Sequence, residues 1–161
     1  VVAGEVLRRL VARTLAQQYG EEMEKACAPF QFALSTRAGT ECVIHALRAA
    51  PDLDEELTVV PVDGIGAFDL MRRRAMLTKL ASLPQASALM PFVLLSYGAP
   101  STYLWTDDSG VVHEIRQGEG GEQGDPLMPA LFALGQHAAL EEVAAHLLPG
   151  ESVFSFLDDI Y

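Results

Sequence analysis

Apolar residues recur at helical spacing in several stretches of the chain, and each of these stretches predicts a helix. In the first stretch, Val6, Leu10 and Leu15 form an apolar stripe and arginines occupy the other faces. In the last stretch, Asp125 suits an N-cap and Pro126 suits the first turn. The expected helices cover Gly4 to Tyr19, Thr40 to Ala49, Leu70 to about Leu83, Pro84 to about Tyr97, and Asp125 to about Leu148.

Strand patterns lie between and after these helices. The apolar run from Leu57 to Val62 predicts a buried strand, although Pro61 cannot donate to a ladder and indicates a bulge or an edge. Ser101 to Gln117 predicts a β-hairpin, and Phe154 to Tyr161 predicts a final strand. This mixture of helices and strands predicts an α+β fold.

The composition suits one globular domain or a large part of one. The 161 residues are 50% hydrophobic, which is enough for a buried core. A net charge of −11 argues against strong nonspecific binding of nucleic acid by this stretch alone. Cys27 and Cys42 match no metal-binding spacing and are expected to be reduced thiols. No apolar run approaches the ~20 residues of a membrane-spanning helix.

Two adjacent carboxylates, Asp158 and Asp159, interrupt the apolar run at the end of the sequence. Burial of these charges beside Phe156 and Ile160 would cost several kcal/mol per ion unless a partner compensates. A divalent cation with oxygen ligands is the usual partner of clustered carboxylates. Asp63, which directly follows an expected strand, is the candidate for the third ligand.

A second pair of adjacent aspartates provides an internal contrast. Asp107 and Asp108 precede Ser109 and Gly110 in the expected turn of the β-hairpin, and they have no apolar flanks. A solvated turn explains this pair without any ligand.

The segment from Gln117 to Gly124 is rich in glycine and leads into the helix expected to start at Asp125. Backbone N–H groups in such a loop, together with a helix N-terminus, can hold a phosphate or a base. Two carboxylate sites at strand ends and a loop of this kind form a suitable set for two-metal phosphoryl transfer.

Three segments, in this order, resemble the motifs of reverse transcriptases of the non-LTR retrotransposon and group II intron type. Asp63 to Asp69, Asp-Gly-Ile-Gly-Ala-Phe-Asp, matches motif A. Gln123 to Pro129 matches motif B, with Met128 in place of a serine. Phe156 to Asp159 matches motif C, with phenylalanine where tyrosine is commoner. The segment from Gln31 to Thr40 is similar to the fingers segment that precedes motif A, so the resemblance covers the chain from about Gln31 to its end.

This resemblance implies which residues bind metal. Asp63, Asp158 and Asp159 would be the catalytic, metal-binding carboxylates, and the backbone carbonyl of Gly64 would be a further ligand. The implied cofactor is a pair of Mg²⁺ ions, with Mn²⁺ as a substitute.

The resemblance also implies which residues contact the incoming nucleotide. Phe68 would be the steric gate, whose ring crowds a 2′-hydroxyl and favours deoxynucleotides. Gln123 and Gly124 would line the nucleotide. A guanidinium fork suits phosphate, and the arginines expected to pair with the triphosphate are Arg37 and one of Arg8 or Arg9.

The fold implied by the resemblance is a polymerase palm, an RRM-like antiparallel sheet with flanking helices, plus part of the fingers. Residues 1–56 would belong to the fingers and 57–161 to the palm of one partial domain. The implied partners are an RNA template, a DNA or RNA primer and a dNTP, with no membrane. The thumb and the return strand after Asp159 are expected to lie outside this fragment, so we expect the fragment to be inactive alone.

Two other functions compete with RNA-directed DNA synthesis. A non-catalytic relic of a retroelement would retain the palm fold, but the intact carboxylates and Phe68 argue against it. An RNA-dependent RNA polymerase fits less well because of motif B and the aromatic residue at position 68.

Several of these residues also have plain structural explanations. Asp69 suits an N-cap, Phe68 suits core packing, and Arg72 to Arg74 suit a solvated helix face. A structural role for Asp158 and Asp159 is the corresponding alternative at motif C. The histidines form no ligand spacing and are expected to be structural or exposed: His45, His113, His137 and His146.

Overall fold

A computed structural model describes residues 6–161, so the expected helical residues Gly4 and Glu5 lie outside the described part. Helices and small antiparallel sheets alternate along the chain, which confirms the α+β prediction. The helices are α1 (Val6–Cys27), α2 (Gly39–Leu53), α3 (Ala67–Leu70), α4 (Arg73–Ala81), the 3₁₀ helix η1 (Pro84–Leu89), α5 (Met90–Tyr97) and α6 (Met128–His146). The strands are β1 (Val62–Asp63), β2 (Ser101–Thr106), β3 (Val112–Gln117), β4 (Ser155–Phe156) and β5 (Asp159–Ile160).

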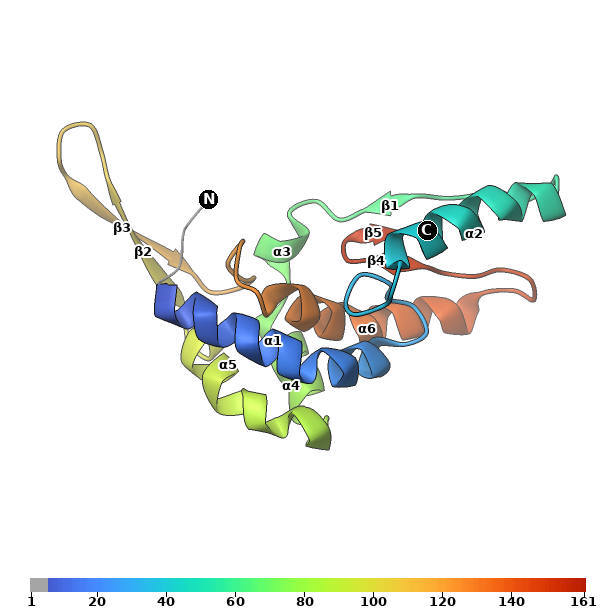
Figure 1. Ribbon diagram of the computed structural model, residues 1–161. Helices are drawn as coiled ribbons and strands as arrows, with labels where there is room; N and C mark the ends of the chain where they lie inside the picture. The colour runs from blue at the N-terminus through green and yellow to red at the C-terminus, as the bar shows by residue number, and fades with distance from the viewer. Residues whose placement is uncertain (1–5) are drawn as a thin grey trace.

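The hydrophobic core forms around α6, which packs against α1 and α4 (Figure 1). The first half of α6 is apolar on nearly all sides, and such a helix is stable only when other elements surround it. Each large apolar side chain buried here contributes roughly 1.5–3 kcal/mol. The largest buried side chains of this core include Met76, Leu80, Leu89, Val93, Leu131 and Leu134.

A small three-stranded sheet, in the order β1-β5-β4, lies beside α2 and α6 (Figure 1). Both strand pairs are antiparallel. Gln31 adds an isolated parallel bridge to Ser155, so the segment after α1 extends the sheet at β4. Of the three aspartates proposed as metal ligands, Asp63 lies in β1 and Asp159 in β5. Asp158 lies in the turn that precedes β5.

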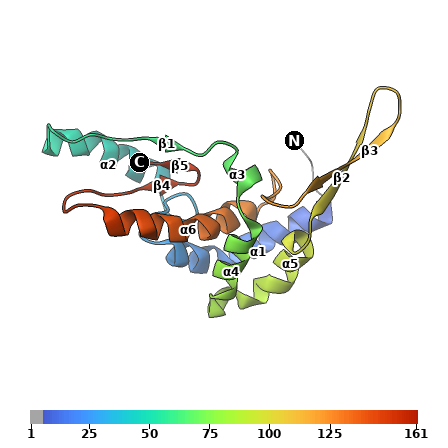
Figure 2. The same ribbon diagram turned by 180° about the vertical axis from the view of Figure 1, so that it is seen from behind.

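Strands β2 and β3 form the predicted hairpin, with the turn at Asp107 to Gly110. The hairpin projects from the helical body as an arm (Figures 1 and 2). Its side chains are largely exposed, including Leu104 and Trp105.

The prediction of a buried strand over Leu57 to Val62 is wrong. Only Val62 and Asp63 form a strand, and the residues from Leu57 to Val62 are all exposed. The physical reason is that β5 is only two residues long and therefore offers a ladder partner to no more of this segment.

Helix α1 is longer than predicted and buries a different face. It continues to Cys27 through the charged segment that was expected to follow it, and Met23 in that segment is fully buried. The start of the predicted apolar stripe faces solvent, with Val6 81% exposed and Leu10 61% exposed, whereas Leu15 is half-buried and packs against the core. The buried residues of α1 are instead Ala12, Met23 and Cys27, and Arg8 near its start forms ion pairs with Glu122 and Asp125.

The helix predicted from Leu70 to Leu83 is broken at Met71 and Arg72 into α3 and α4. Asp69 lies inside α3 rather than capping a helix, since Gly66 occupies the N-cap. Arg72 and Arg74 are exposed as expected, but Arg73 is only 4% exposed, so the prediction of a solvated arginine run is wrong at that position.

Helix α6 begins at Met128, three residues after the predicted N-cap, and Asp125 is buried ahead of it. The two cysteines are free thiols as predicted, Cys27 buried and Cys42 exposed. Burial raises the pKa of the Cys27 thiol to about 12. His137 is buried, and the other histidines are exposed.

Candidate metal and nucleotide site

The chain closes the hairpin that carries Asp158 and Asp159, which corrects the expectation that its return strand lies outside the fragment. Strands β4 and β5 pair with Phe156 opposite Asp159, and a two-residue turn, Leu157 and Asp158, joins them. Beyond the strands, Phe154 and Tyr161 exchange two backbone hydrogen bonds of 2.8 Å. The two aspartates therefore sit at the tip of a hairpin and not in the middle of one strand.

The hairpin brings Asp159 opposite Asp63. In the β1–β5 register, Asp63 pairs with Asp159, and Val62 pairs with Ile160. Residues directly opposite each other in an antiparallel pair place their Cβ atoms about 4.5–5.5 Å apart on the same face. Two of the three predicted carboxylates are therefore neighbours, although they are far apart in the sequence, and Asp158 follows in the adjoining turn.

The turn beside these carboxylates is strained. Leu157 has a φ of 56°, a left-handed conformation that costs an L-residue with a branched side chain roughly 1–2 kcal/mol. The favoured two-residue hairpin turns have a positive φ at their first central position, where glycine, asparagine or aspartate is usual. Strain of this kind persists only where the surroundings hold it, and it gathers at functional sites.

The carboxylates are not buried, so the burial cost expected from the sequence does not arise. Asp63 and Asp159 are exposed and Asp158 is half-buried. Within residues 6–161, none of the three side chains makes a hydrogen bond or an ion pair with the rest of the protein. Like charges directly opposite each other destabilise a strand pair, and a bound cation would remove that repulsion.

The donor set suits a hard divalent cation, because its atoms are carboxylate oxygens. The carbonyl of Gly64 accepts a hydrogen bond of 3.2 Å from the Ala67 N–H, and a carbonyl has a second lone pair for a ligand. No group of three or more histidine, cysteine or acidic side chains in the described part of the chain is already assembled for a metal. The facing pair Asp63 and Asp159 is what the fold brings together.

A buried amide network, which the sequence analysis missed, holds the turn. The Gln31 Oε1 atom accepts a hydrogen bond of 2.9 Å from the Leu157 N–H, and Gln31 Nε2 donates to Ser155 Oγ at 3.1 Å. Ser155 Oγ lies within hydrogen-bond distance of Gln136 Oε1 and of the Leu157 carbonyl. The only signal in the sequence was that Gln31 opens the segment similar to the fingers of reverse transcriptases.

The glycine-rich loop is fixed to the break between α3 and α4. Gly121 donates its N–H to the Phe68 carbonyl at 2.9 Å, and Gly120 donates to the Met71 carbonyl at 2.7 Å. A Cβ on Gly120, whose φ is 71°, would lie 2.1 Å from the Asp69 carbonyl oxygen. Only glycine therefore allows this loop to approach the segment that follows Asp63.

The buried Arg73 side chain connects the loop to the base of the β2–β3 arm. Its Nε donates to the Gly120 carbonyl at 2.8 Å, and its terminal nitrogens donate to the Ala99 carbonyl at 2.6 Å and to Ser101 Oγ at 2.9 Å. The guanidinium also lies over the Tyr97 ring, 5.3 Å from its centroid. Each of the three guanidinium nitrogens of Arg73 thus donates one hydrogen bond, which makes the side chain a structural anchor.

Arg8 has carboxylate partners within the chain. It donates to Glu122 at 2.8 Å and to the buried Asp125 at 3.0 Å. Burial disfavours the charged form of Arg8, but the hydrogen bond to Glu122 and the charge of Glu122 outweigh it and raise the pKa of the guanidinium. Of the arginines considered for the triphosphate, Arg9 and Arg37 are exposed.

Asp125 also accepts a hydrogen bond from the Tyr97 hydroxyl. Burial and this hydrogen bond together raise the pKa of Tyr97, so the phenol stays protonated and remains a donor. The carboxylate, the phenol and Arg8 hold the end of the glycine-rich loop, directly after Gln123 and Gly124, which are exposed.

Phe68 packs against the core, as the structural explanation of this residue expected. Its ring stacks on Phe132 of α6, with centroids 4.6 Å apart and planes 17° apart. It is only half-buried, and its carbonyl receives the hydrogen bond from Gly121. Packing on α6 therefore fixes the ring beside the loop that carries Gln123.

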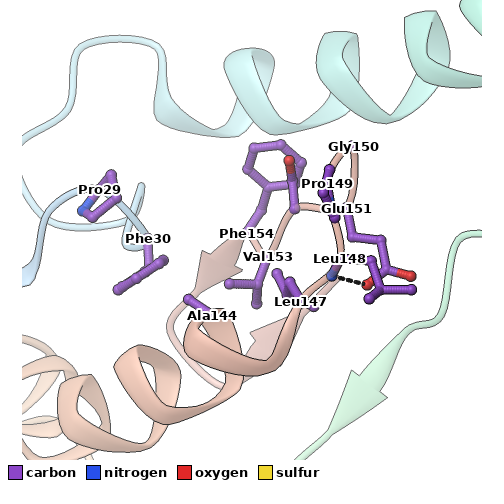
Figure 3. A pocket seen from close by; sticks show the side chains of 11 residues that line it. Pro29, Phe30, Ala144, Leu147, Leu148, Pro149, Gly150, Glu151, Val153 and Phe154 are labelled. Atoms are coloured by element: carbon purple, nitrogen blue, oxygen red, sulfur yellow. Dashed lines mark hydrogen bonds between the residues drawn. The ribbon is translucent and has the colours of Figure 1, made fainter.

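A separate cavity of about 600 Å³ lies at the far end of α6, between Phe30, Leu147 and the loop that reaches Phe154 (Figure 3). Among the described residues that line it, Glu151 is the one with a carboxylate and none is basic; Glu151 accepts the Leu148 N–H at 2.7 Å. This chemistry does not suit a nucleotide.

Comparison of the chain with models of known protein families, with characterised proteins and with solved structures finds no match. Within residues 6–161, no single helix is long and apolar enough to cross a membrane. The pair Arg73–Ala81 and Pro84–Tyr97, bent by 120°, meets that test only when both helices are taken together, and its Met76 and Leu89 are buried in the core.

Proposed function

We propose that this chain is the fingers and palm part of an RNA-directed DNA polymerase of the retrotransposon type. The observation that carries the proposal is the pairing of Asp63 with Asp159 across β1 and β5, with Asp158 in the strained turn between β4 and β5. These are the aspartates of the segments that resemble motifs A and C. The fold joins them from distant parts of the chain, and within residues 6–161 their carboxylates have no hydrogen-bond or ion-pair partner, which supports a shared ligand.

In the proposed reaction, the 3′-hydroxyl oxygen of a primer attacks the α-phosphorus of a dNTP, and pyrophosphate leaves. Two magnesium ions would activate the hydroxyl and neutralise the charge on the transferring phosphate. The carboxylates of Asp63, Asp158 and Asp159 would hold these ions, with the Gly64 carbonyl as a further oxygen ligand. Each oxygen donor is of the type that magnesium prefers.

The remaining residues of the site would orient the nucleotide. Phe68, held by Phe132, would crowd a 2′-hydroxyl, and Gln123 and Gly124 would line the base and sugar. Arg37 offers an exposed guanidinium for the triphosphate. Arg8 would act indirectly, since it fixes the loop that ends at Asp125.

The test is primer extension with a form of the protein that continues past Tyr161 through a thumb segment, on an RNA template with dNTPs and magnesium. We expect extension by the unchanged protein and none by Asp158→Ala. Asp108→Ala in the β2–β3 turn is the matched control and should extend normally. The proposal fails if nothing is incorporated or if Asp158→Ala extends as well as the unchanged protein.

The same assay separates the competing functions. A non-catalytic relic would incorporate nothing under any condition. A preference for rNTPs over dNTPs would contradict the steric-gate role of Phe68 and favour an RNA polymerase.

A further inference from the structure

A side chain from outside the three motif-like segments reaches the turn that carries Asp158. Gln31 follows α1, is 5% exposed, and lies beside Ser155, which is fully buried. The segment around Gln31 is held against β4 by two backbone hydrogen bonds, from the Ser155 N–H to the Phe30 carbonyl at 2.8 Å and from the Phe32 N–H to the Ser155 carbonyl at 2.9 Å. These backbone hydrogen bonds alone already fix the position of Gln31 relative to the hairpin.

All the polar atoms of the Gln31 side chain have partners. Oε1 accepts from the Leu157 N–H at 2.9 Å and from the Ala33 N–H at 3.1 Å, and Nε2 donates to Ser155 Oγ at 3.1 Å. A buried amide with both lone pairs of its oxygen in use has one orientation, because a flip would oppose donor to donor. The contact to Leu157 thus sets the position of one particular backbone N–H.

That N–H belongs to the strained residue of the turn. Leu157 has a φ of 56° and immediately precedes Asp158. Without an external partner, the turn would relax toward an ordinary conformation, and the peptide that carries Asp158 would rotate with it.

We infer that Gln31 is a positioning residue of the proposed metal site, which it serves by holding the Leu157–Asp158 turn in the geometry that presents Asp158 and Asp159 to a divalent cation. The inference rests on the proposed function. Hydrogen-bond partners that orient metal ligands change metal affinity by about 10–100-fold when they are removed. Gln31 differs from such partners in acting on the backbone of the turn and not on a carboxylate.

The network offers a matched control. Gln136 also belongs to it, but within residues 6–161 its side chain makes a single hydrogen bond, with Ser155 Oγ at 3.2 Å, and none with Leu157 or Asp158. Gln136→Met and Gln31→Met each replace an amide by a side chain of similar volume. Both should reduce stability, but only Gln31→Met should affect the turn.

The experiment is a titration of the 161-residue chain with Mn²⁺, with free Mn²⁺ measured by electron paramagnetic resonance. Asp63→Asn provides the reference for loss of the site. We expect Gln31→Met to weaken Mn²⁺ binding by about 10-fold or more, and Gln136→Met to bind as the unchanged chain does. Circular dichroism checks that each variant is folded at the temperature of the titration.

The outcomes separate this inference from the proposed function. If the unchanged chain binds no Mn²⁺, or if Asp63→Asn binds equally well, the metal site itself is wrong. If the unchanged chain binds and Asp63→Asn does not, but folded Gln31→Met keeps full affinity or Gln136→Met loses as much, the positioning role is wrong.

A measurement on the unchanged chain covers the case in which Gln31→Met does not fold. The Leu157 amide should exchange its hydrogen slowly, because it donates to the buried Gln31 oxygen, whereas the exposed Asp108 amide should exchange fast. Exchange of the Leu157 amide at the rate of an open turn would overturn the inference.

Discussion

Two turns of this molecule carry adjacent aspartates, and they use them in opposite ways. In the β2–β3 arm, the Asp107 carboxylate accepts hydrogen bonds from the N–H groups of Ser109 and Val111, both at 2.9 Å, and lies 2.8 Å from His113 Nε2. In the β4–β5 hairpin, the turn is held by the Gln31 amide, and within residues 6–161 neither Asp158 nor Asp159 makes a side-chain hydrogen bond.

The difference teaches how a turn can leave its carboxylates available. The carboxylate of Asp107 accepts hydrogen bonds from its own turn, and the hydrogen bond from His113 lowers the pKa of its carboxyl group. The Leu157 N–H donates to a distant amide, so within residues 6–161 the carboxylates beside it stay free of hydrogen bonds. Three mutations test this comparison.

The largest change in stability is expected for Ser155, the buried residue at the centre of the network that holds the β4–β5 hairpin. Ser155→Ala removes a fully buried hydroxyl that Gln31, Gln136 and the Leu157 carbonyl contact, and it should lower the free energy of unfolding by about 1–3 kcal/mol. Urea denaturation followed by circular dichroism measures this loss. The control, Ser109→Ala at the exposed tip of the other hairpin, should change stability by about 0.5 kcal/mol or less. Equal losses for the two variants would show that both hairpins are held alike.

A smaller change, an increase in stability, is expected when one of the facing aspartates Asp63 and Asp159 is neutralised. Without divalent cations, Asp63→Asn should raise the free energy of unfolding by about 0.2–1 kcal/mol, because it removes the repulsion between Asp63 and Asp159. Thermal unfolding in a chelator and then in magnesium measures both states, and magnesium should stabilise the unchanged chain more than the variant. Asp108→Asn is the control and should respond to magnesium as the unchanged chain does. A loss of stability for Asp63→Asn in chelator would contradict the repulsion.

The smallest effect concerns acid and the β2–β3 arm. The pKa of Asp107 in the folded chain lies below its ordinary value of 3.8, so its contribution to stability is complete above about pH 3.8 and is lost as the pH falls through the lowered value. Trp105, the only tryptophan, stacks on His113 with ring centroids 5.1 Å apart and reports on the arm by fluorescence. Asp107→Asn should flatten this acid transition. An unchanged transition in the variant would mean that Asp107 does not hold the turn.

Local patterns explain why parts of the fold were predictable. The β2–β3 hairpin was predicted correctly because alternation and the Asp-Asp-Ser-Gly turn act over neighbouring residues. Helix α6 was predicted because its apolar residues are dense enough to require burial. Its start at Met128 was not predicted, and Asp125, the expected N-cap, instead lies ahead of the helix in an ion pair with Arg8.

Other parts depended on partners that no local pattern reveals. The apolar stripe of α1 predicted the wrong face at the start of the helix, since α1 buries Ala12, Met23 and Cys27 against distant elements. Arg73 was expected to be exposed like Arg72 and Arg74. In the structure it is buried, and its guanidinium donates to the Gly120 and Ala99 carbonyls. Pairing partners far away in sequence decided both outcomes.

For the candidate site, the sequence alone supplied the candidate residues: three aspartates, a glycine-rich loop and an aromatic residue five positions after Asp63, in an order that resembles the motifs of reverse transcriptases. Residue type and local spacing carry that information. Only the tertiary structure decided that Asp63 faces Asp159, that the Asp158 turn is closed within the chain, and that Gln31 holds it. Strand register and a hydrogen bond between residues 31 and 157 join segments that are distant along the chain, so they arise only when the whole chain packs.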